Sequence, residues 1–115
     1  RRFLPILVIS LMAATSTITA TPAQAANNWD GIAWSWVKKP RCGYLACWQI
    51  KVKAAQVSCP GGLFVTLDEK NRSGDIIDNP VDSVNSLSYG QTAILTFYSF
   101  YEGYSTGSVS EMNCY

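Results

Sequence analysis

The sequence has 115 residues, with nine Lys and Arg against eight Asp and Glu, a formal net charge of +1 and no histidine. The near-neutral charge provides no basic field of the kind that binds nucleic acids or anionic membranes. The lack of histidine excludes catalytic sites of the Ser-His-Asp and Cys-His types.

Residues 1–25 have the composition of a secretory signal peptide. Paired arginines precede an apolar stretch at 3–14, and the Ala-Gln-Ala sequence at 23–25 is a small-x-small pattern that a signal peptidase recognises. The apolar stretch is shorter than the roughly 20 residues that a membrane-spanning helix needs, which disfavours an uncleaved anchor. We therefore expect a single secreted, extracellular domain over 26–115, with no membrane association after cleavage.

The chain has four cysteines, Cys42, Cys47, Cys59 and Cys114. An even number in a small exported chain indicates disulfide bonds, which a domain of this size needs because its core is small. Four cysteines allow three connectivities, and the sequence leaves the choice open. We prefer Cys42 with Cys47, which closes a short loop, and Cys59 with Cys114, which ties the domain to its last strand. A zinc site is the competing interpretation, but the chain lacks CxxC pairs and histidine. We expect no metal and no cofactor.

The first predicted strands alternate apolar and polar side chains. Residues 47–54 and 62–70 both show the period of two that is typical of a half-buried strand. The NRSGD sequence that follows predicts a turn, and residues 75–80 predict a short strand that Pro80 ends or places at a sheet edge. The interior side chains expected from these strands are Trp48, Ile50, Val52, Ala54, Leu63, Val65 and Leu67.

The later elements repeat the same pattern. A turn at 88–91 precedes an alternating strand at 92–100, which places Ala93, Leu95 and Phe97 on one face. A last strand is predicted at approximately 108–114. Several short strands separated by Gly, Pro, Asn and Ser predict an all-β chain folded as an antiparallel sandwich of two sheets.

The sequence GGLFVTLDEKNRSGDIIDNPVDSVNSLSYGQTAILTF, residues 61–97, resembles FxLYD-type and related immunoglobulin-like bacterial domains. These domains share an x-F-V-x-L strand, a polar turn with glycine, an l-x-x-G-Q turn and an alternating strand that ends in Phe. The ending MNCY resembles small exported proteins of Gram-positive bacteria without an assigned activity. Tyr89 departs from the family pattern, which usually has Pro before the glycine. The resemblance implies a bacterial, small antiparallel immunoglobulin-like β-sandwich stapled by disulfides that serves as an interaction module, and it provides no catalytic residue.

Carboxylates are the remaining catalytic candidates. Asp68, Glu69, Asp75 and Asp78 cluster around one hairpin turn, and a paired-carboxylate mechanism needs only two such groups across a cleft. Acids at a turn are usually solvated, and a small sandwich has little room for a cleft, so we expect no enzymatic activity. The same turn superficially follows an EF-hand calcium loop. Its first position is Glu69 where the loop should have Asp, and its twelfth position is Pro80 where the loop should have Glu. These differences favour a simple hairpin turn over a calcium site.

Aromatic side chains are the candidates for binding. Residues two apart in a strand share a face, so Trp34 and Trp36 should lie side by side, either as a binding face or as a plug for an open end of the sandwich. Residues 97–104 have the sequence FYSFYEGY, and both faces of that strand cannot be interior. At least some of its rings should be exposed, either for contact with a ligand or as cover for a sheet edge. The candidate binding residues are Trp34, Trp36, Tyr98, Tyr101 and Tyr104, whereas Trp29 is expected to be loosely held.

Three functional hypotheses follow. The first is an exported, monomeric, non-enzymatic interaction module that binds a protein or a cell-envelope partner such as a glycan. The second is a carbohydrate-binding module whose exposed Trp and Tyr rings stack on sugars. The third is a small secreted inhibitor or toxin that uses the loop between Cys42 and Cys47, where Lys38, Lys39 and Arg41 form a basic cluster.

Overall fold

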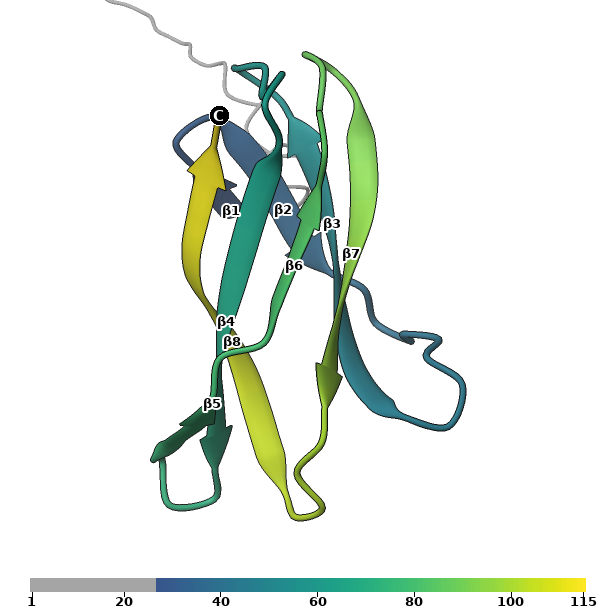
Figure 1. The fold of residues 1–115 in the computed structure, drawn as a ribbon, viewed down its shortest axis with the longest axis vertical. Helices are drawn as coiled ribbons and strands as arrows, with labels where there is room; N and C mark the ends of the chain where they lie inside the picture. The colour runs from purple at the N-terminus through teal and green to yellow at the C-terminus, as the bar shows by residue number, and fades with distance from the viewer. Residues whose placement is uncertain (1–26) are drawn as a thin grey trace, which may run out of the picture.

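The computed structural model describes residues 27–115, so the predicted signal peptide lies outside the described residues. The strands are β1 (Asn27–Trp29), β2 (Ile32–Trp36), β3 (Ala46–Ala54), β4 (Leu63–Asn71), β5 (Ile76–Asp78), β6 (Val81–Val84), β7 (Thr92–Ser99) and β8 (Ser105–Cys114). One antiparallel sheet has the order β1-β2-β3-β7. In the other, β8 pairs along all of β4, and the short β5 and β6 pair with its opposite edge (Figure 1). The prediction of an all-β sandwich is confirmed.

The interior of the sandwich comes from the alternating strands. The inward-facing side chains of β3, β4 and β7 are buried together, as their period of two predicts. The buried apolar core consists of Ile32, Ile50, Val52, Ala54, Cys59, Leu63, Val65, Leu67, Leu87, Leu95, Phe97 and Met112. Trp48 and Ala93, which were also predicted to be interior, are half-buried and pack against this core.

The described part of the chain begins with a tight hairpin that the predicted elements did not include. Asp30 and Gly31 connect β1 to β2 with φ angles of 48° and 93°. A two-residue turn with both φ angles positive matches the twist of the flanking strands, and Asp-Gly is a favoured sequence for it. Trp29 pairs with Ile32 and packs against the core. The expectation that Trp29 is loosely held is therefore wrong.

Pro80 divides the edge of the second sheet into two short strands. β5 and β6 lie before and after it, and Leu67 donates a backbone hydrogen bond to the Pro80 carbonyl at 2.9 Å. Proline has no N–H to give to a ladder, so a break at this position is expected. The strand β6 was not predicted from the sequence, and β8 begins at Ser105, three residues earlier than predicted.

The structure contains the two preferred disulfide bonds, Cys42–Cys47 and Cys59–Cys114. Both pairings are therefore confirmed. Disulfide bonds persist in oxidising compartments, so they fit an extracellular environment. Among residues 27–115 no helix is long and apolar enough to cross a membrane.

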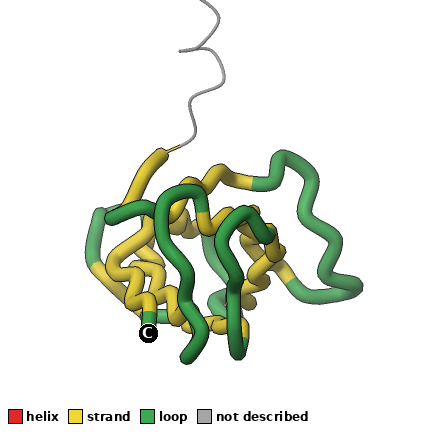
Figure 2. Tube along the Cα trace, turned by 90° about the horizontal axis from the view of Figure 1, so that it is seen from above, coloured by secondary structure: helices red, strands yellow, loops and turns green. Residues whose placement is uncertain are grey.

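The connections gather at the two ends of the sandwich (Figure 1). We call one the disulfide end, formed by residues 55–62, 85–91 and Tyr115. We call the other the aromatic end, formed by the turn at 71–75 and the loop at 100–104. The β2–β3 loop stands out to the side of the strands when the molecule is seen from above (Figure 2).

Candidate binding site at the aromatic end

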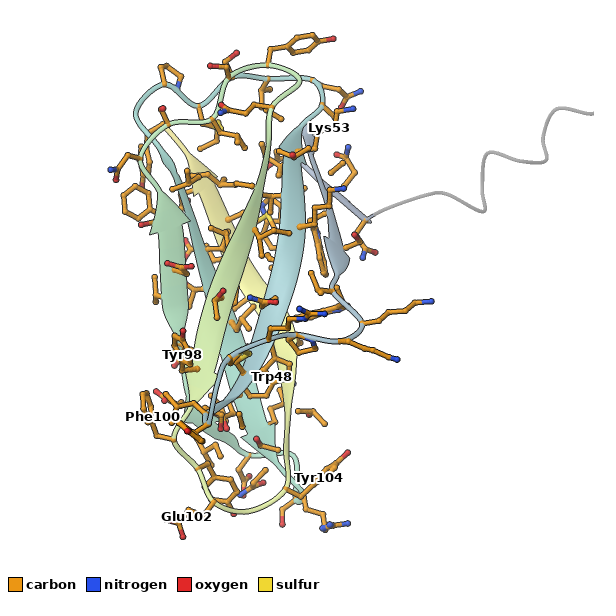
Figure 3. The ribbon with its side chains drawn as sticks, turned by 90° about the vertical axis from the view of Figure 1, so that its right-hand side faces the viewer. Trp48, Lys53, Tyr98, Phe100, Glu102 and Tyr104 are labelled. Carbon is orange, nitrogen blue, oxygen red and sulfur yellow. A yellow bond between two sulfur atoms is a disulfide. The ribbon has the colours of Figure 1, made fainter. Side chains whose placement is uncertain are left out.

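Four exposed rings lie where β7 passes into β8. β7 ends at Ser99, so the chain leaves the sheet and turns through the loop before β8 begins. The exposed fractions are 40% for Tyr98, 73% for Phe100, 45% for Tyr101 and 56% for Tyr104. The expectation that at least some rings of this run are exposed is confirmed, and Phe100 is among the exposed rings. Figure 3 shows Tyr98, Phe100 and Tyr104 at the same end of the molecule as Trp48.

Trp48 lies on the inner face of β3 and reaches this end. A Cβ atom on Gly107 of β8 would lie 2.9 Å from the Trp48 ring, so the indole packs directly over the bare backbone of that strand. The ring helps to form a cavity of about 320 Å³. The cavity is lined by Ala46, Cys47, Trp48, Ser99, Tyr101, Gly103, Tyr104 and Ser105. It therefore combines three aromatic rings with two serine hydroxyls.

Glu69 is a fully buried carboxylate beneath these rings. The hydroxyls of Ser99 and Ser105 donate hydrogen bonds to Glu69 Oε2 at 2.5 and 2.7 Å. The backbone N–H of Tyr101 donates to the Ser99 hydroxyl at 3.3 Å. The carboxylate thus joins β4 to both strands that flank the aromatic loop. The other oxygen, Oε1, is buried without a hydrogen-bond partner among the residues that the structure describes.

A second cavity, of about 230 Å³, lies next to this carboxylate. Its lining consists of Glu69, Ile77, Asp78, Phe100 and Tyr101. Asp78 is the direct partner of Glu69 across the β4–β5 ladder, so both carboxylates belong to the same face of the sheet. The lining contains two acids and two aromatic rings, and no lysine or arginine.

The 71–75 turn closes the aromatic end on one side. The Asn71 side-chain oxygen accepts hydrogen bonds from the backbone N–H groups of Ser73 and Asp75, both at 3.0 Å. This Asx geometry confirms the predicted hairpin turn. The Arg72 guanidinium lies 4.6 Å from the centre of the Tyr104 ring. This cation–π contact joins the turn to the aromatic loop.

Trp34 and Trp36 lie on a different part of the sandwich from the tyrosines. They pair directly with Val52 and Ile50, which are fully buried, so both indoles project from the inner face of the first sheet. Their ring centres are 5.5 Å apart in an edge-to-face arrangement, which confirms that the two rings lie side by side. Trp34 packs against the core, and Trp36 is 37% exposed. This arrangement favours the interpretation that the two indoles close an open end of the sandwich over the interpretation that they form a binding face.

Trp48 lies between the two aromatic groups in strand register. It follows the same inner face of β3, two residues from Ile50, the direct partner of Trp36. Diagonal neighbours on one face are within reach of aromatic side chains. The five predicted binding residues thus form two groups, and of these residues Tyr101 and Tyr104 line cavities at the aromatic end.

Glu69 lies in the interior rather than in solvent. The expectation that the acids of this hairpin are solvated is wrong for Glu69, which is fully buried. The alternation of Leu63, Val65 and Leu67 continues to position 69, so the strand period alone places Glu69 on the inward face. Phe100 was also absent from the predicted binding residues, although it lies in the aromatic run that was singled out.

The β2–β3 loop presents a second exposed feature. Tyr44 is fully exposed, and neighbouring Leu45 is 46% exposed. The Cys42–Cys47 bond closes this loop, and the backbone N–H of Arg41 donates to the Gln49 side-chain oxygen at 3.3 Å. Tyr44 and Leu45 line neither of the two cavities described above.

Searches against protein-family models, curated proteins and solved structures find no match to this chain. Its function is therefore inferred from the side chains of the aromatic end.

Proposed function

We propose that the chain is a secreted, non-enzymatic interaction module that binds a protein or another cell-envelope component through its aromatic end. The observation that carries this proposal is the concentration of exposed rings on one short segment, Tyr98, Phe100, Tyr101 and Tyr104. Exposed aromatic side chains are enriched among the residues that dominate binding energy at protein interfaces. The immunoglobulin-like sandwich and the bacterial, exported origin are part of the same proposal.

The shape of this end supports binding rather than catalysis. The cavities are small, and the carboxylate that could serve as an acid or base, Glu69, is already engaged by two serine hydroxyls. Those hydrogen bonds fix the aromatic loop on the sheet. A loop fixed in this way presents its rings without a large entropic cost of ordering on binding.

Carbohydrate binding is the second candidate, favoured by the cavity at Trp48. Its rings, Trp48, Tyr101 and Tyr104, offer flat apolar surfaces. Ser99 and Ser105 line the same space, and their hydroxyls, which donate to Glu69, still have oxygen lone pairs that can accept from a sugar. Planar rings with a few convergent polar groups are the usual composition of a small-ligand site.

Cosedimentation of the purified protein with the insoluble envelope fraction of its source cells tests the first proposal. We expect the Phe100→Ser/Tyr104→Ser double variant to bind about tenfold more weakly or worse, because it removes two exposed rings from the aromatic end. The matched control is Tyr44→Ser/Tyr89→Ser, which removes two exposed rings elsewhere and should bind like the unmodified protein. Equal losses in both double variants, or no sedimentation of the unmodified protein, would contradict the proposal.

Treatment of the envelope fraction separates the two candidates. Protease digestion should abolish sedimentation if the partner is a protein, and digestion of the glycan should abolish it if the ligand is carbohydrate. Tyr104→Phe keeps the ring and should preserve sugar stacking, whereas Tyr104→Ser should remove it. Soluble envelope oligosaccharides that fail to compete would exclude the second candidate.

A further inference from the structure

Glu69 and Asp78 place two negative charges on one face of the second sheet. They are direct partners in the antiparallel β4–β5 ladder, and like charges in directly opposite positions destabilise a sheet. Asp78 Oδ1 accepts a hydrogen bond from the backbone N–H of Asn79 at 2.8 Å, and no cationic residue lines the cavity beside the two acids. The pair therefore forms a local site of negative potential.

Glu69 also has an unused hydrogen-bond acceptor in this region. Its side chain is completely buried, and Oε1 has no partner among residues 27–115, whereas Oε2 has two. A buried polar atom without a partner has a substantial cost in free energy, and almost all such atoms in folded proteins are satisfied. Oε1 has almost no accessible surface, so a donor from outside the chain would satisfy it once the side chains that cover it move aside.

The rest of the cavity wall is aromatic. Phe100 and Tyr101 line the same space as the two carboxylates. The face of an aromatic ring attracts a cation that lies within about 6 Å of its centre. Rings and carboxylates together therefore select a positively charged group that also carries apolar atoms.

We propose that this cavity binds the ammonium group of an alkyl chain, such as the side chain of a lysine on the binding partner. The ammonium pairs with the exposed Asp78, and its methylene groups pack against the exposed Phe100 and Tyr101 side chains, whose displacement on binding opens Glu69 Oε1 to the same ammonium. An ammonium group has three donors and no acceptor, which suits a lining that contains two carboxylates and no cationic side chain. A space of about 230 Å³ suits one side chain better than a row of sugar rings. The inference rests on the proposed function, since it names the chemistry of the partner at the same end.

Calorimetric titration of the purified protein with Nα-acetyl-lysine methylamide tests the proposal. We expect the ammonium compound to bind about tenfold more tightly than its Nε-acetylated form, which has the same chain but no charge. Glu69→Gln and Asp78→Asn should each weaken binding about tenfold, because each removes one negative charge from the cavity. The Phe100 and Tyr101 ring resonances should shift in NMR spectra during the titration.

Asp75→Asn is the matched control, since it removes one negative charge from the neighbouring turn and Asp75 does not line the cavity. It should bind like the unmodified protein. Asp78 is exposed, so Asp78→Asn tests the site even if the buried Glu69→Gln variant fails to fold. Equal affinity for the charged and acetylated compounds, or equal losses for Asp75→Asn and Asp78→Asn, would overturn the proposal. Glu69-dependent binding of glucosamine without binding of the lysine compound would also overturn it, in favour of an amino sugar.

The two proposals fail in different ways. If Phe100→Ser/Tyr104→Ser abolishes envelope binding but the lysine compound does not bind, the interaction module stands and the ammonium site is wrong. If the lysine compound binds with the expected dependence on Glu69 and Asp78 while both double variants sediment normally, the ammonium site stands and the envelope proposal is wrong.

Discussion

The two ends of the sandwich are held together by different kinds of bond. At the disulfide end, Cys59 is bonded to Cys114 and exchanges backbone hydrogen bonds with Leu87 at 2.8 and 3.0 Å. The carbonyl of Tyr115 accepts another from the Gly61 N–H at 2.8 Å. The segments at this end are therefore joined by a disulfide bond and by backbone hydrogen bonds. Apart from the two cysteines, these bonds do not depend on which side chains the residues carry.

At the aromatic end, side chains make the connections. Ser99 and Ser105 bind the buried Glu69 carboxylate, and Arg72 lies on the Tyr104 ring. Side-chain contacts hold the loop while leaving the two cavities between its rings and the strands. The difference indicates that the disulfide end mainly stabilises the fold, whereas the aromatic end has the composition of a binding surface.

The largest expected effect comes from the disulfide end. Replacing Cys59 and Cys114 by alanine should lower the free energy of unfolding by about 4 kcal/mol, because their bond closes a long loop, with a sequence separation of 55. Urea unfolding followed by tryptophan fluorescence measures the change. A loss of less than about 1 kcal/mol in the free energy of unfolding would contradict the view that the Cys59–Cys114 bond is the main covalent stabilisation of the fold.

Glu69→Ala should have the next largest effect. We expect a loss of about 3 kcal/mol, because the substitution removes two hydrogen bonds to a charged group and leaves a cavity among buried side chains. Glu69→Gln should cost less, since it keeps the shape and one acceptor. Glu102→Ala, at the exposed tip of the same loop (Figure 3), should change stability by no more than about 0.5 kcal/mol. Similar losses for Glu69→Ala and Glu102→Ala would show that the buried carboxylate does not hold the loop.

Removal of the Cys42–Cys47 bond should be milder. Its sequence separation is only 5, so the chain-entropy model predicts a loss of about 2 kcal/mol for the double alanine variant. Urea unfolding under the same conditions allows direct comparison with the Cys59 and Cys114 variant. A larger loss of stability for this variant than for the Cys59 and Cys114 variant would contradict the view that the disulfide end mainly stabilises the fold.

The smallest effect on stability should come from the exposed rings. Phe100→Ser is expected to change the free energy of unfolding by about 0.5 kcal/mol or less, because the side chain is 73% exposed, while it weakens binding to the envelope. Thermal unfolding and cosedimentation on the same sample separate the two properties. A large drop in unfolding temperature would mean that Phe100 belongs to the structure rather than to a binding surface.

Much of the fold was predictable from local patterns. Alternation in residues 47–54, 62–70 and 92–100 located β3, β4 and β7 and their buried faces, because side chains in a strand point to opposite sides in turn. The Asp30-Gly31 hairpin was also predictable from its turn sequence but was not recognised. β6 was not predicted, because four residues after a proline carry too little periodicity to distinguish a strand from a loop.

The site was predictable only in part. The run FYSFYEGY indicated that some rings must be exposed, since one strand cannot bury both faces. Strand alternation could have placed Glu69 inside, but it could not show which groups would meet its carboxylate. Ser99 and Ser105 reach Glu69 across sequence separations of 30 and 36, and such partners are chosen by how the sheets pack.

By itself, the sequence determined β3, β4 and β7, their inward faces and the need for disulfide bonds, because these follow from side-chain period, turn residues and the small size of the core. The tertiary structure decided what no local pattern contains. It placed Asp78 opposite Glu69, left Oε1 without a partner among residues 27–115 and separated the tyrosines from Trp34 and Trp36. The physical reason is that the register and the packing of two sheets depend on contacts between residues far apart in the chain.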